Sequence, residues 1–512
     1  MERIASDGIA FTRIGALSGD AVGALVGDIV GAVPGPNLSM EVERASGNPF
    51  YILELVAAFQ EAGAVELTDG VAELVRPALP PSIKVTVLRR IATLPPDTVD
   101  VLRSCAMLGS SFTLRDLAIS TGREARDLMH ALAPALGAGF LREIGGREIG
   151  GREIGGREID ERLAFRHDLV RAALYEDVPA TVRRAVHRAI GSAFASADYP
   201  TASVATHMGL GADVGDEEAI EWLLRAADEV SWKDFFIHAD LLRRAEGLCL
   251  PNDARLQLVR GRLAGALGMT GHGEEAVAIA TDVLAGAPDA EVETETRFGF
   301  GHALRLLGRP DEAVEQFMHV AASPLTDSGH RAAALADIAS VRFVQGDLAS
   351  ARLSASEAIT IPLTDNWHGA TLGHMILSYL ADAEGDVRSA LDHGLDAVRW
   401  SDREFETGRG VTTARVPVAM ALFAADRHTE AFEQLHIGHQ RRGDVGIEDA
   451  QIYEHALRGF RYMIGDWDEA LGSPSDVLED ASPGILASFA VRSMIRQHRG
   501  DFDAARSEVE RG

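Results

Sequence analysis

Cysteine and lysine are almost absent from this sequence of 512 residues, which contains two of each. The two cysteines, Cys105 and Cys249, are isolated in the sequence and lack C-x-x-C spacing, which argues against both a disulfide framework and a zinc site and favours a reducing compartment. Aromatic residues make up only 6%, and this scarcity favours helices over sheets. The N-terminus has no basic start leading into an apolar run, and the apolar residues 16–33 include two aspartates. We therefore expect a cytoplasmic protein without a signal peptide or a membrane contact.

The motifs of the common enzyme classes are also missing. A nucleotide-hydrolysing loop has the form G-x-x-x-x-G-K-[ST], because its amides cradle the phosphates and its lysine neutralises them. Neither Lys84 nor Lys233 follows a glycine, and G-x-S-x-G and H-E-x-x-H do not occur. His436 and His439 form H-x-x-H without a carboxylate at matching spacing, which a polar helix face explains better than a metal site. We predict no catalytic residues, no metal site and no enzymatic activity.

The negative charge is distributed unevenly along the chain. The formal net charge is −28, yet residues 79–195 carry 17 Lys+Arg against 14 Asp+Glu. Residues 196–512 carry 28 Lys+Arg against 52 Asp+Glu. An excess of negative charge repels the phosphate backbone of nucleic acids. Direct binding of nucleic acid is therefore not expected for the rear segment.

A repeat with steps of 35 to 41 residues runs through the rear segment. In each unit a turn residue is followed five positions later by alanine. Glycine can end one helix in the left-handed conformation and aspartate can cap the next, while alanine permits close helix packing. The pattern predicts stacked helix hairpins in a tetratricopeptide-like α-superhelix that offers a binding surface. The seven segments are Gly271–Ala276, Gly308–Ala313, Gly346–Ala351, Gly385–Ala390, Asp426–Ala431, Gly465–Ala470 and Gly500–Ala505.

Residues 79–195 have the pattern of short helices followed by a strand pair, which is the outline of a winged helix. Proline followed by serine or aspartate marks two of the helix starts. Residues 142–159 repeat the unit REIGG almost four times, which we interpret as a tandem expansion in the surface wing, where added length costs little. The predicted helices are Ile83–Leu94, Thr98–Leu108, Leu114–Thr121 and Glu124–Leu136.

Three stretches resemble one known family. Glu43–Gly63, with its GNPF motif, is similar to the segment that closes the ATPase module of STAND-type regulators. Leu79–Gly122 resembles the winged helix that follows that module, and Arg162–Ala195 resembles the segment before the repeats. The chain thus resembles the large ATP-binding LuxR-type transcriptional regulators with tetratricopeptide repeats. The resemblance implies a mainly α fold with a helical remnant of the ATPase lid (1–78), a winged-helix-like domain (79–195) and helical repeats (196–512).

The resemblance also implies where a nucleotide would lie. Gly47, Asn48 and Pro49 would be at its adenine edge, and His167 would face its phosphates; in intact relatives that nucleotide is ATP or ADP. Only 46 residues precede Gly47 and no helix-turn-helix follows the repeats, so we expect a regulator truncated at both ends, without a cofactor and with vestigial contacts at most. A helix-initiating turn explains Gly-Asn-Pro equally well, and a structural role explains the histidine.

Three functions remain open at this point. The first is a regulatory or sensing scaffold whose repeats bind a protein or a small inducer, with self-association as a further outcome. The second is a DNA-binding regulator that uses the winged helix, with Arg183, Arg184 and Arg188 near His187 contacting phosphates; a solvated cationic face explains these arginines more simply. The third is a signalling protein that retains nucleotide affinity through the lid.

Overall fold

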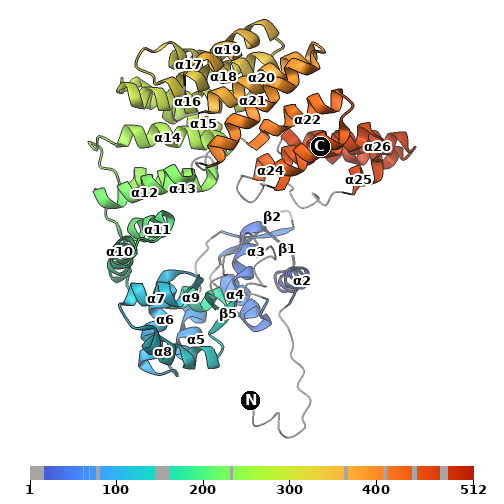
Figure 1. Ribbon diagram of the computed structural model, residues 1–512. Coiled ribbons are helices and arrows are strands. Elements are labelled where there is room, and N and C mark those ends of the chain that lie inside the picture. The colour runs from blue at the N-terminus through green and yellow to red at the C-terminus, as the bar shows by residue number, and fades with distance from the viewer. Residues whose placement is uncertain are drawn as a thin grey trace. The chain divides into compact units, whose positions relative to one another are not determined.

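The computed structural model describes residues 17–511, apart from 46, 62, 69, 76–80, 145–161, 231–233, 363–366, 407–411, 441–446 and 473–482. The described residues are mainly helical (Figure 1), which confirms the predicted fold class. They form two compact units, Met1–Ala212 and Asp213–Gly512. The predicted domain boundary between residues 78 and 79 lies outside the described residues.

The first unit begins with helices around a small sheet. Strand β3 lies between the other two strands, parallel to β1 and antiparallel to β2. Glu73 of β3 fixes the start of α3, because its Oε1 accepts hydrogen bonds from the backbone N–H groups of Asn37 (3.0 Å) and Leu38 (3.3 Å). Strands this short leave no recognisable alternation in the sequence. The elements are α2 (Gly19–Val30), β1 (Val33–Pro34), α3 (Pro36–Glu43), α4 (Pro49–Glu61), β2 (Val65–Thr68) and β3 (Val71–Leu74).

Four helices and a second three-stranded sheet follow in the first unit. The four predicted helices are confirmed to within three residues at each end, and strand β6 pairs antiparallel with both β5 and the unpredicted β4. Helix α7 begins with a reciprocal capping box between Thr113 and Asp116. Beyond its first three residues, which belong to β5, the REIGG repeat lies outside the described residues. The elements are α5 (Pro81–Ile91), α6 (Pro96–Leu108), β4 (Ser111–Phe112), α7 (Leu114–Thr121), α8 (Ala125–Gly137), β5 (Leu141–Ile144) and β6 (Arg162–Phe165).

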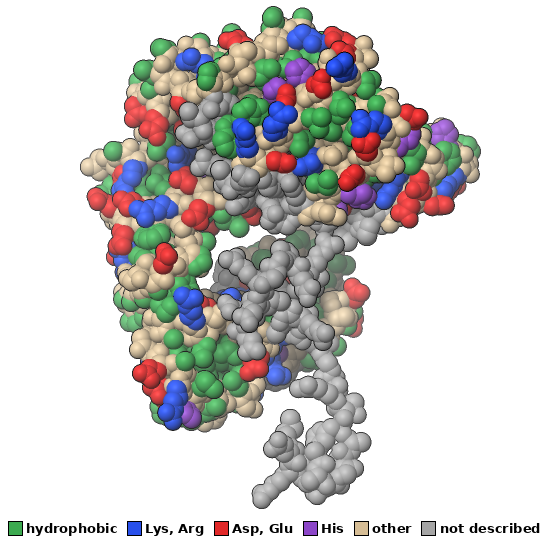
Figure 2. All heavy atoms as spheres, in the orientation of Figure 1, with side chains coloured by type: hydrophobic (Ala, Val, Ile, Leu, Met, Phe, Trp, Pro, Cys, Tyr) green, Lys and Arg blue, Asp and Glu red, His purple; other side chains and the backbone are tan. Residues whose placement is uncertain are grey.

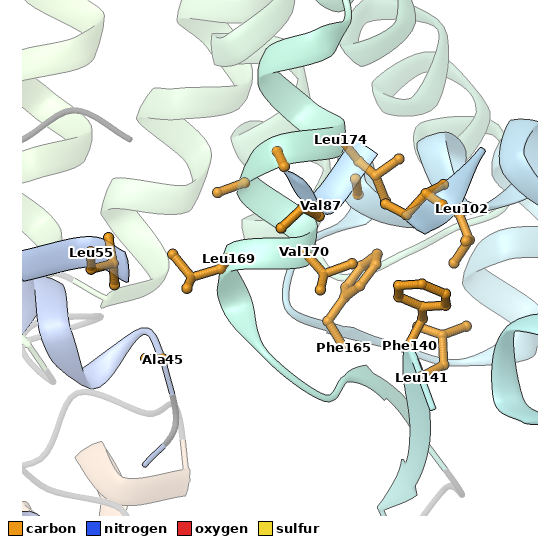
Figure 3. Packing of buried hydrophobic residues seen from close by; sticks show 14 of the residues in the cluster. Ala45, Leu55, Val87, Leu102, Phe140, Leu141, Phe165, Leu169, Val170 and Leu174 are labelled. Atoms are coloured by element: carbon orange, nitrogen blue, oxygen red, sulfur yellow. The ribbon is translucent and has the colours of Figure 1, made fainter. Parts of the chain in front are cut away.

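One hydrophobic core joins these two parts of the first unit (Figure 3). Leu55 of α4 and Leu169 of α9 (Asp168–Asp177) are both completely buried in this core. Phe165 of β6 packs edge-on against Phe112 of β4, with ring centroids 6.3 Å apart. Burial of each large apolar side chain stabilises the fold by roughly 1.5–3 kcal/mol. The unit ends with α10 (Ala180–Ser196) and α11 (Thr201–Gly211).

The second unit is a succession of antiparallel helix hairpins (Figure 1). It begins with α12 and α13, and a 3-10 turn, Thr412–Ala414, precedes α22. The helices are α12 (Glu217–Val230), α13 (Phe235–Leu248), α14 (Leu256–Met269), α15 (Gly273–Ala285), α16 (Ala290–Leu306), α17 (Pro310–Ala322), α18 (Ser328–Val344), α19 (Leu348–Thr360), α20 (His368–Ala383), α21 (Val387–Glu406), α22 (Arg415–Ala424), α23 (His428–Gln440), α24 (Ile447–Met463), α25 (Trp467–Leu471), α26 (Pro483–His498) and α27 (Phe502–Arg511).

The turns between paired helices have the predicted conformation. All seven turn residues have positive φ, from 62° at Asp426 to 85° at Gly465. The alanine five positions later is buried in every unit, with exposure between 0% at Ala276 and 8% at Ala505. Asp347 caps the helix after its turn by accepting a hydrogen bond of 3.1 Å from the backbone N–H of Ser350. The predicted array of helix hairpins is confirmed.

Neighbouring hairpins approach closely where glycine replaces a side chain. A Cβ atom added to Gly299 of α16 would lie 2.6 Å from the Cα atom of Gly265 on α14. A Cβ atom added to Gly268 would lie 2.6 Å from the Cβ atom of Ala303. Both distances are below any normal carbon–carbon contact, so the two helices can adopt this separation only with glycine at these positions.

Within the described part of the chain, no helix combines the length and the apolar character needed to span a bilayer. On the visible face, acidic and basic side chains alternate rather than gather by sign (Figure 2). Many of these charges are paired; for example, Arg243 Nη2 lies 2.9 Å from Glu275 Oε1. On the face drawn, negative side chains are thus interspersed with positive ones.

Candidate functional site: a cationic pocket at the start of helix α9

A pocket of about 210 Å³ lies in the first unit, where the start of α4, the end of α5, the turn after α8 and the β6–α9 junction meet. It brings together Asn48 and His167, two of the four residues that the resemblance assigns to a nucleotide site. Gly47 and Pro49 are not among its lining residues. The other residues of the pocket are Arg90, Ala138, Gly139, Phe140, Arg166 and Val170.

The Gly47-Asn48-Pro49 segment forms the turn that starts α4. Gly47 is buried with φ 68°, and its carbonyl accepts a hydrogen bond of 2.9 Å from the backbone N–H of Leu17. The carbonyl of Asn48 accepts the N–H of Ile52 (3.0 Å), which closes the first turn of the helix. Pro49, exposed at the first helical position, has no N–H to leave unsatisfied there. The segment is thus a helix-initiating turn that also places one polar side chain in the pocket.

His167 is the residue immediately before helix α9. Its extended backbone (φ −134°, ψ 129°) turns the chain from β6 into the helix. Burial lowers the pKa of its imidazole, and the positive charges of Arg166, Arg90 and Arg142 lower it further; a hydrogen bond to the backbone of Ala45 opposes the shift. The ring is therefore neutral at pH 7 and can donate one hydrogen bond and accept another.

Two guanidinium groups make the pocket cationic. The guanidinium carbon of Arg90 lies 5.5 Å from the ring centroid of Phe140, in cation–π geometry. Gly139 has φ 74°, and a Cβ atom placed on it would be 3.6 Å from Nε of Arg166, so the guanidinium of Arg166 lies close to this turn. Two positive groups and a neutral donor around one cavity favour an anionic ligand with several acceptor oxygens.

Ion pairs tie the start of α9 to Arg44, which directly follows α3 in the first unit. Asp168 accepts from Arg44 Nε (3.2 Å) through one carboxylate oxygen and from Arg171 Nε (2.8 Å) through the other. Arg44 also bonds Glu41 at 2.7 Å, and this pairing contributes to the raised pKa of its guanidinium. These contacts fix the start of α9, the segment that also supplies the pocket-lining residues His167 and Val170.

The pocket can bind and orient an anion, and its described residues include no nucleophile beside a general base. Among the described residues, no group of three His, Cys, Asp or Glu side chains is placed to hold a metal ion. Arg90 and Arg166 were missed by the sequence analysis. Arg166 directly precedes His167, and this Arg-His pair was the one local signal of a cationic site; Arg90 is separated from it by 76 residues and reaches the pocket only through the fold.

The three arginines considered as DNA contacts lie on α10. Arg183 is half-buried and donates to the carbonyls of Tyr175 (3.1 Å) and Val178 (3.0 Å), so it satisfies the open end of helix α9. Arg184 is exposed and Arg188 is half-buried on the same helix. The geometry gives Arg183 a structural role in the first unit, where its guanidinium also lies 4.8 Å from the Tyr175 ring centroid.

His187 lies on the same helix as these arginines but is buried, with only 2% of the residue exposed. Its Nε2 lies 3.0 Å from the hydroxyl of Tyr175, and its Nδ1 lies 2.9 Å from Nδ1 of His207 on α11. Burial lowers the pKa of both histidines to about 4, so both rings are neutral at pH 7. A neutral pair can share one hydrogen between the two Nδ1 atoms, and the contact joins α9, α10 and α11.

No protein family and no curated protein matches the sequence. Among solved structures, the chain is similar to a Signal Transduction ATPase with Numerous Domains with a tetratricopeptide repeat sensor from Pyrococcus horikoshii (11% identity, 98% of this chain, 72% of that chain, TM-score 0.33). It is also similar to the apo quorum sensor NprR from B. thuringiensis (12% identity, 64% of this chain, 92% of that chain, TM-score 0.40). A third similar structure is the APC/C hetero-tetramer Cut9–Hcn1 (12% identity, 76% of this chain, 83% of that chain, TM-score 0.34). These values identify no relative, and the fold assignment rests on the helix hairpins themselves.

Proposed function

We propose that this protein is a non-enzymatic regulatory scaffold whose helical repeats bind a protein or a small inducer. The observation that carries this proposal is the array of stacked hairpins in the second unit, with its regular turns and buried alanines. Each hairpin in such an array contacts mainly its two neighbouring hairpins. The array therefore presents a long surface that a partner can occupy without disrupting a central core. Partner binding changes the association state of the chain, and self-association is one outcome.

We also propose kinship with the large ATP-binding LuxR-type regulators, without a P-loop or LuxR helix-turn-helix in this sequence. The motifs of Glu43–Gly63 and Arg162–Ala195 support it, because residues from both border one pocket. The order of α5, α6, β4, α7, α8, β5 and β6 also supports a winged-helix domain in the middle segment. In this proposal the first unit transmits the state of the repeats to a further protein.

Cross-linking of the full chain in cell extract, followed by mass spectrometry, tests the scaffold function. The chain has only two lysines but 77 Asp+Glu, so carboxylate-reactive reagents are needed and amine-reactive reagents serve as a control of low labelling. We expect partner cross-links to concentrate on residues 213–512. Reproducible partner cross-links confined to residues 17–212 would contradict the proposal. The absence of any partner cross-link at saturating amounts of both reagents would also contradict it.

A second candidate function is residual nucleotide binding, and the meeting of Asn48, His167, Arg90 and Arg166 in one pocket favours it. Calorimetric titration of the full chain with ADP tests it, with Arg166→Gln and Arg115→Gln compared. Arg115 is a matched control, because it stacks over Tyr199 away from the pocket. We expect weak, salt-sensitive binding that Arg166→Gln abolishes and Arg115→Gln preserves. Equal loss in both variants, or no heat with the unmodified chain, would exclude this function.

A further inference from the structure

A second polar hollow lies within the repeat unit, in the hairpin of α16 and α17. Its volume is about 320 Å³, near the lower end of the range of about 300–1,000 Å³ that is typical of small-molecule sites. The start of α16 forms one wall, the end of α17 forms the other, and the loop before α18 closes it. The lining residues are Ala290, Glu293, Thr294, Arg297, His319, Val320, Ala322, Ser323, Pro324 and Thr326.

Two buried hydroxyl groups border the hollow. Thr294 is 9% exposed and Thr326 is 7% exposed, and their Oγ1 atoms lie 3.3 Å apart. In such a pair one hydroxyl donates to the other, which leaves one O–H and several lone pairs for another partner. Buried hydroxyl groups are rarely left with unused capacity unless water or a ligand satisfies it. The two threonines therefore offer a donor and an acceptor to a small polar molecule.

The guanidinium of Arg297 is held in a fixed plane at one wall. Its Nε donates to Glu293 Oε1 (2.8 Å) and its Nη1 donates to Gln316 Oε1 (2.8 Å). The side chain is only 20% exposed, so its orientation is also restricted by packing. These two contacts do not use Nη2, whose two hydrogens can serve an acceptor in the hollow. A guanidinium fixed in this way binds a carboxylate with little loss of conformational entropy.

A second guanidinium contacts the loop that precedes α18. Arg331 Nη2 donates to the carbonyl of Ser323 (2.9 Å). Its Nε is buried, and none of the described residues supplies it with a hydrogen-bond acceptor. A buried N–H of a charged group that lacks an acceptor is costly, and a nearby negative ligand reduces that cost. Glu293 at the rim disfavours a doubly charged anion, which leaves a single carboxylate as the matching charge.

We propose that this hollow binds a small carboxylate ligand with an additional hydrogen-bonding group, such as an amino acid or the C-terminus of a short peptide. The carboxylate meets Arg297 Nη2 and His319 at the rim, and the second polar group meets Thr294 and Thr326. The assignment deepens the proposed sensing function, because it names the class of inducer and the hairpin that binds it.

Titration calorimetry with the dipeptide glycylglycine on the full chain tests this site, with acetate and inorganic phosphate as comparison probes. We expect glycylglycine to bind more tightly than acetate, and phosphate to bind weakest. Arg297→Gln removes a charge-assisted contact and should weaken glycylglycine binding about tenfold or more. Thr294→Val keeps the side-chain volume but removes the hydroxyl, and should weaken glycylglycine binding while leaving acetate binding unchanged. Arg309→Gln is the matched control, because Arg309 pairs with Glu312 at the far turn of the same hairpin.

Circular dichroism of each variant establishes that the repeats are folded, and Arg297→Lys provides a variant that retains the charge. Three outcomes would overturn the inference: no glycylglycine binding, tighter binding of phosphate than of glycylglycine, or glycylglycine affinity in the folded Thr294→Val and Arg297→Gln variants that equals that of the unmodified chain. The scaffold proposal and this site can be contradicted independently. If a partner cross-links to residues 213–512 but Arg297→Gln has no effect on glycylglycine binding, the scaffold proposal stands and this binding site is ruled out.

Discussion

At the scale of single residues, the closest packing in the repeat unit depends on glycine. Gly299 faces Gly265 across the contact between α14 and α16, and any Cβ atom there meets backbone. Gly247 in α13 is also within a helix, yet a Cβ atom on it would have no heavy atom within 4 Å. The two positions separate the effect of packing from the effect of helix propensity.

We expect Gly299→Ala to lower the free energy of unfolding of the repeat unit by about 1–3 kcal/mol, because the two helices must move apart. Gly247→Ala should leave it unchanged or raise it by up to about 1 kcal/mol, because alanine favours the helix and restricts the unfolded chain. Urea denaturation followed by circular dichroism measures both. A stabilised Gly299→Ala variant would show that the backbones are not in contact.

Residues that act locally could be predicted from the sequence, and residues that meet across the fold could not. The turn glycines and the alanines five positions later were predictable, because their conformation is set within one hairpin. Asn48 and His167 entered through a resemblance, and the sequence alone did not place them in one pocket. Arg90, Arg166, Thr294 and Thr326 were missed, because their proximity arises only from tertiary packing.

At the scale of helices, two acid–histidine pairs connect α16 and α18. In the first pair α16 supplies the acid and α18 the histidine, and in the second pair α16 supplies the histidine and α18 the acid. Glu295 of α16 lies 3.5 Å from Nε2 of His330 on α18, and His302 Nε2 of α16 lies 3.5 Å from Asp337 Oδ2 on α18. The hydrogen bond to Glu295 is the largest cause that raises the pKa of His330 to about 9. Burial raises the pKa of Asp337 to about 7 and lowers that of His302 to about 3. The Glu295–His330 pair is thus ionic at neutral pH. Burial instead favours the uncharged forms of His302 and Asp337.

We expect His330→Gln to lower the free energy of unfolding at pH 6 by about 1–3 kcal/mol and to change it little at pH 10. The folded pKa of about 9 exceeds the reference value of 6.5, so the stabilisation is complete below pH 6.5 and is lost as the pH rises through 9. Urea denaturation at both pH values measures this. His428→Gln is the control, because His428 forms an exposed pair with Asp426. A loss of equal size at pH 6 and pH 10 would show that packing, not charge, is responsible.

Whereas His330→Gln should lower the free energy of unfolding, we expect Asp337→Asn to raise it at pH 8, because asparagine cannot ionise in the buried site. A folded pKa of about 7 against a reference of 3.8 means that the folded chain retains the proton, so stability falls as the pH rises between these values. The variant should therefore be more stable than the unmodified chain at pH 8 and similar to it at pH 4. Asp240→Asn, at an exposed position of α13, should show no such difference. A destabilised Asp337→Asn variant at pH 8 would indicate that the pair with His302 is ionic.

The regular hairpins and the small sheets differ in how far the sequence predicts them. A helix of two or more turns repeats its apolar positions, and all four helices predicted in the middle segment, which have 8 to 13 residues, are present. Strands of two to four residues, such as Ser111–Phe112, do not show a pattern of their own and form because the tertiary fold supplies a partner.

At the scale of the whole molecule, the chain consists of two compact units with separate cores. Units of this kind generally unfold as distinct cooperative steps. We expect two transitions in differential scanning calorimetry of the full chain, and Gly299→Ala should lower the temperature of only one of them. A single transition that shifts as a whole in this variant would show that the two units unfold together.

The left-handed turn residues have a further consequence for how such a gene can change over time. Each hairpin is closed by its own turn and packs chiefly against its two neighbours. An insertion or deletion of about forty codons, the length of one repeat, therefore adds or removes one complete hairpin. The remaining contacts are reproduced by the new neighbours. Descendants of this chain can therefore differ in the number of hairpins more readily than in the geometry of any one of them.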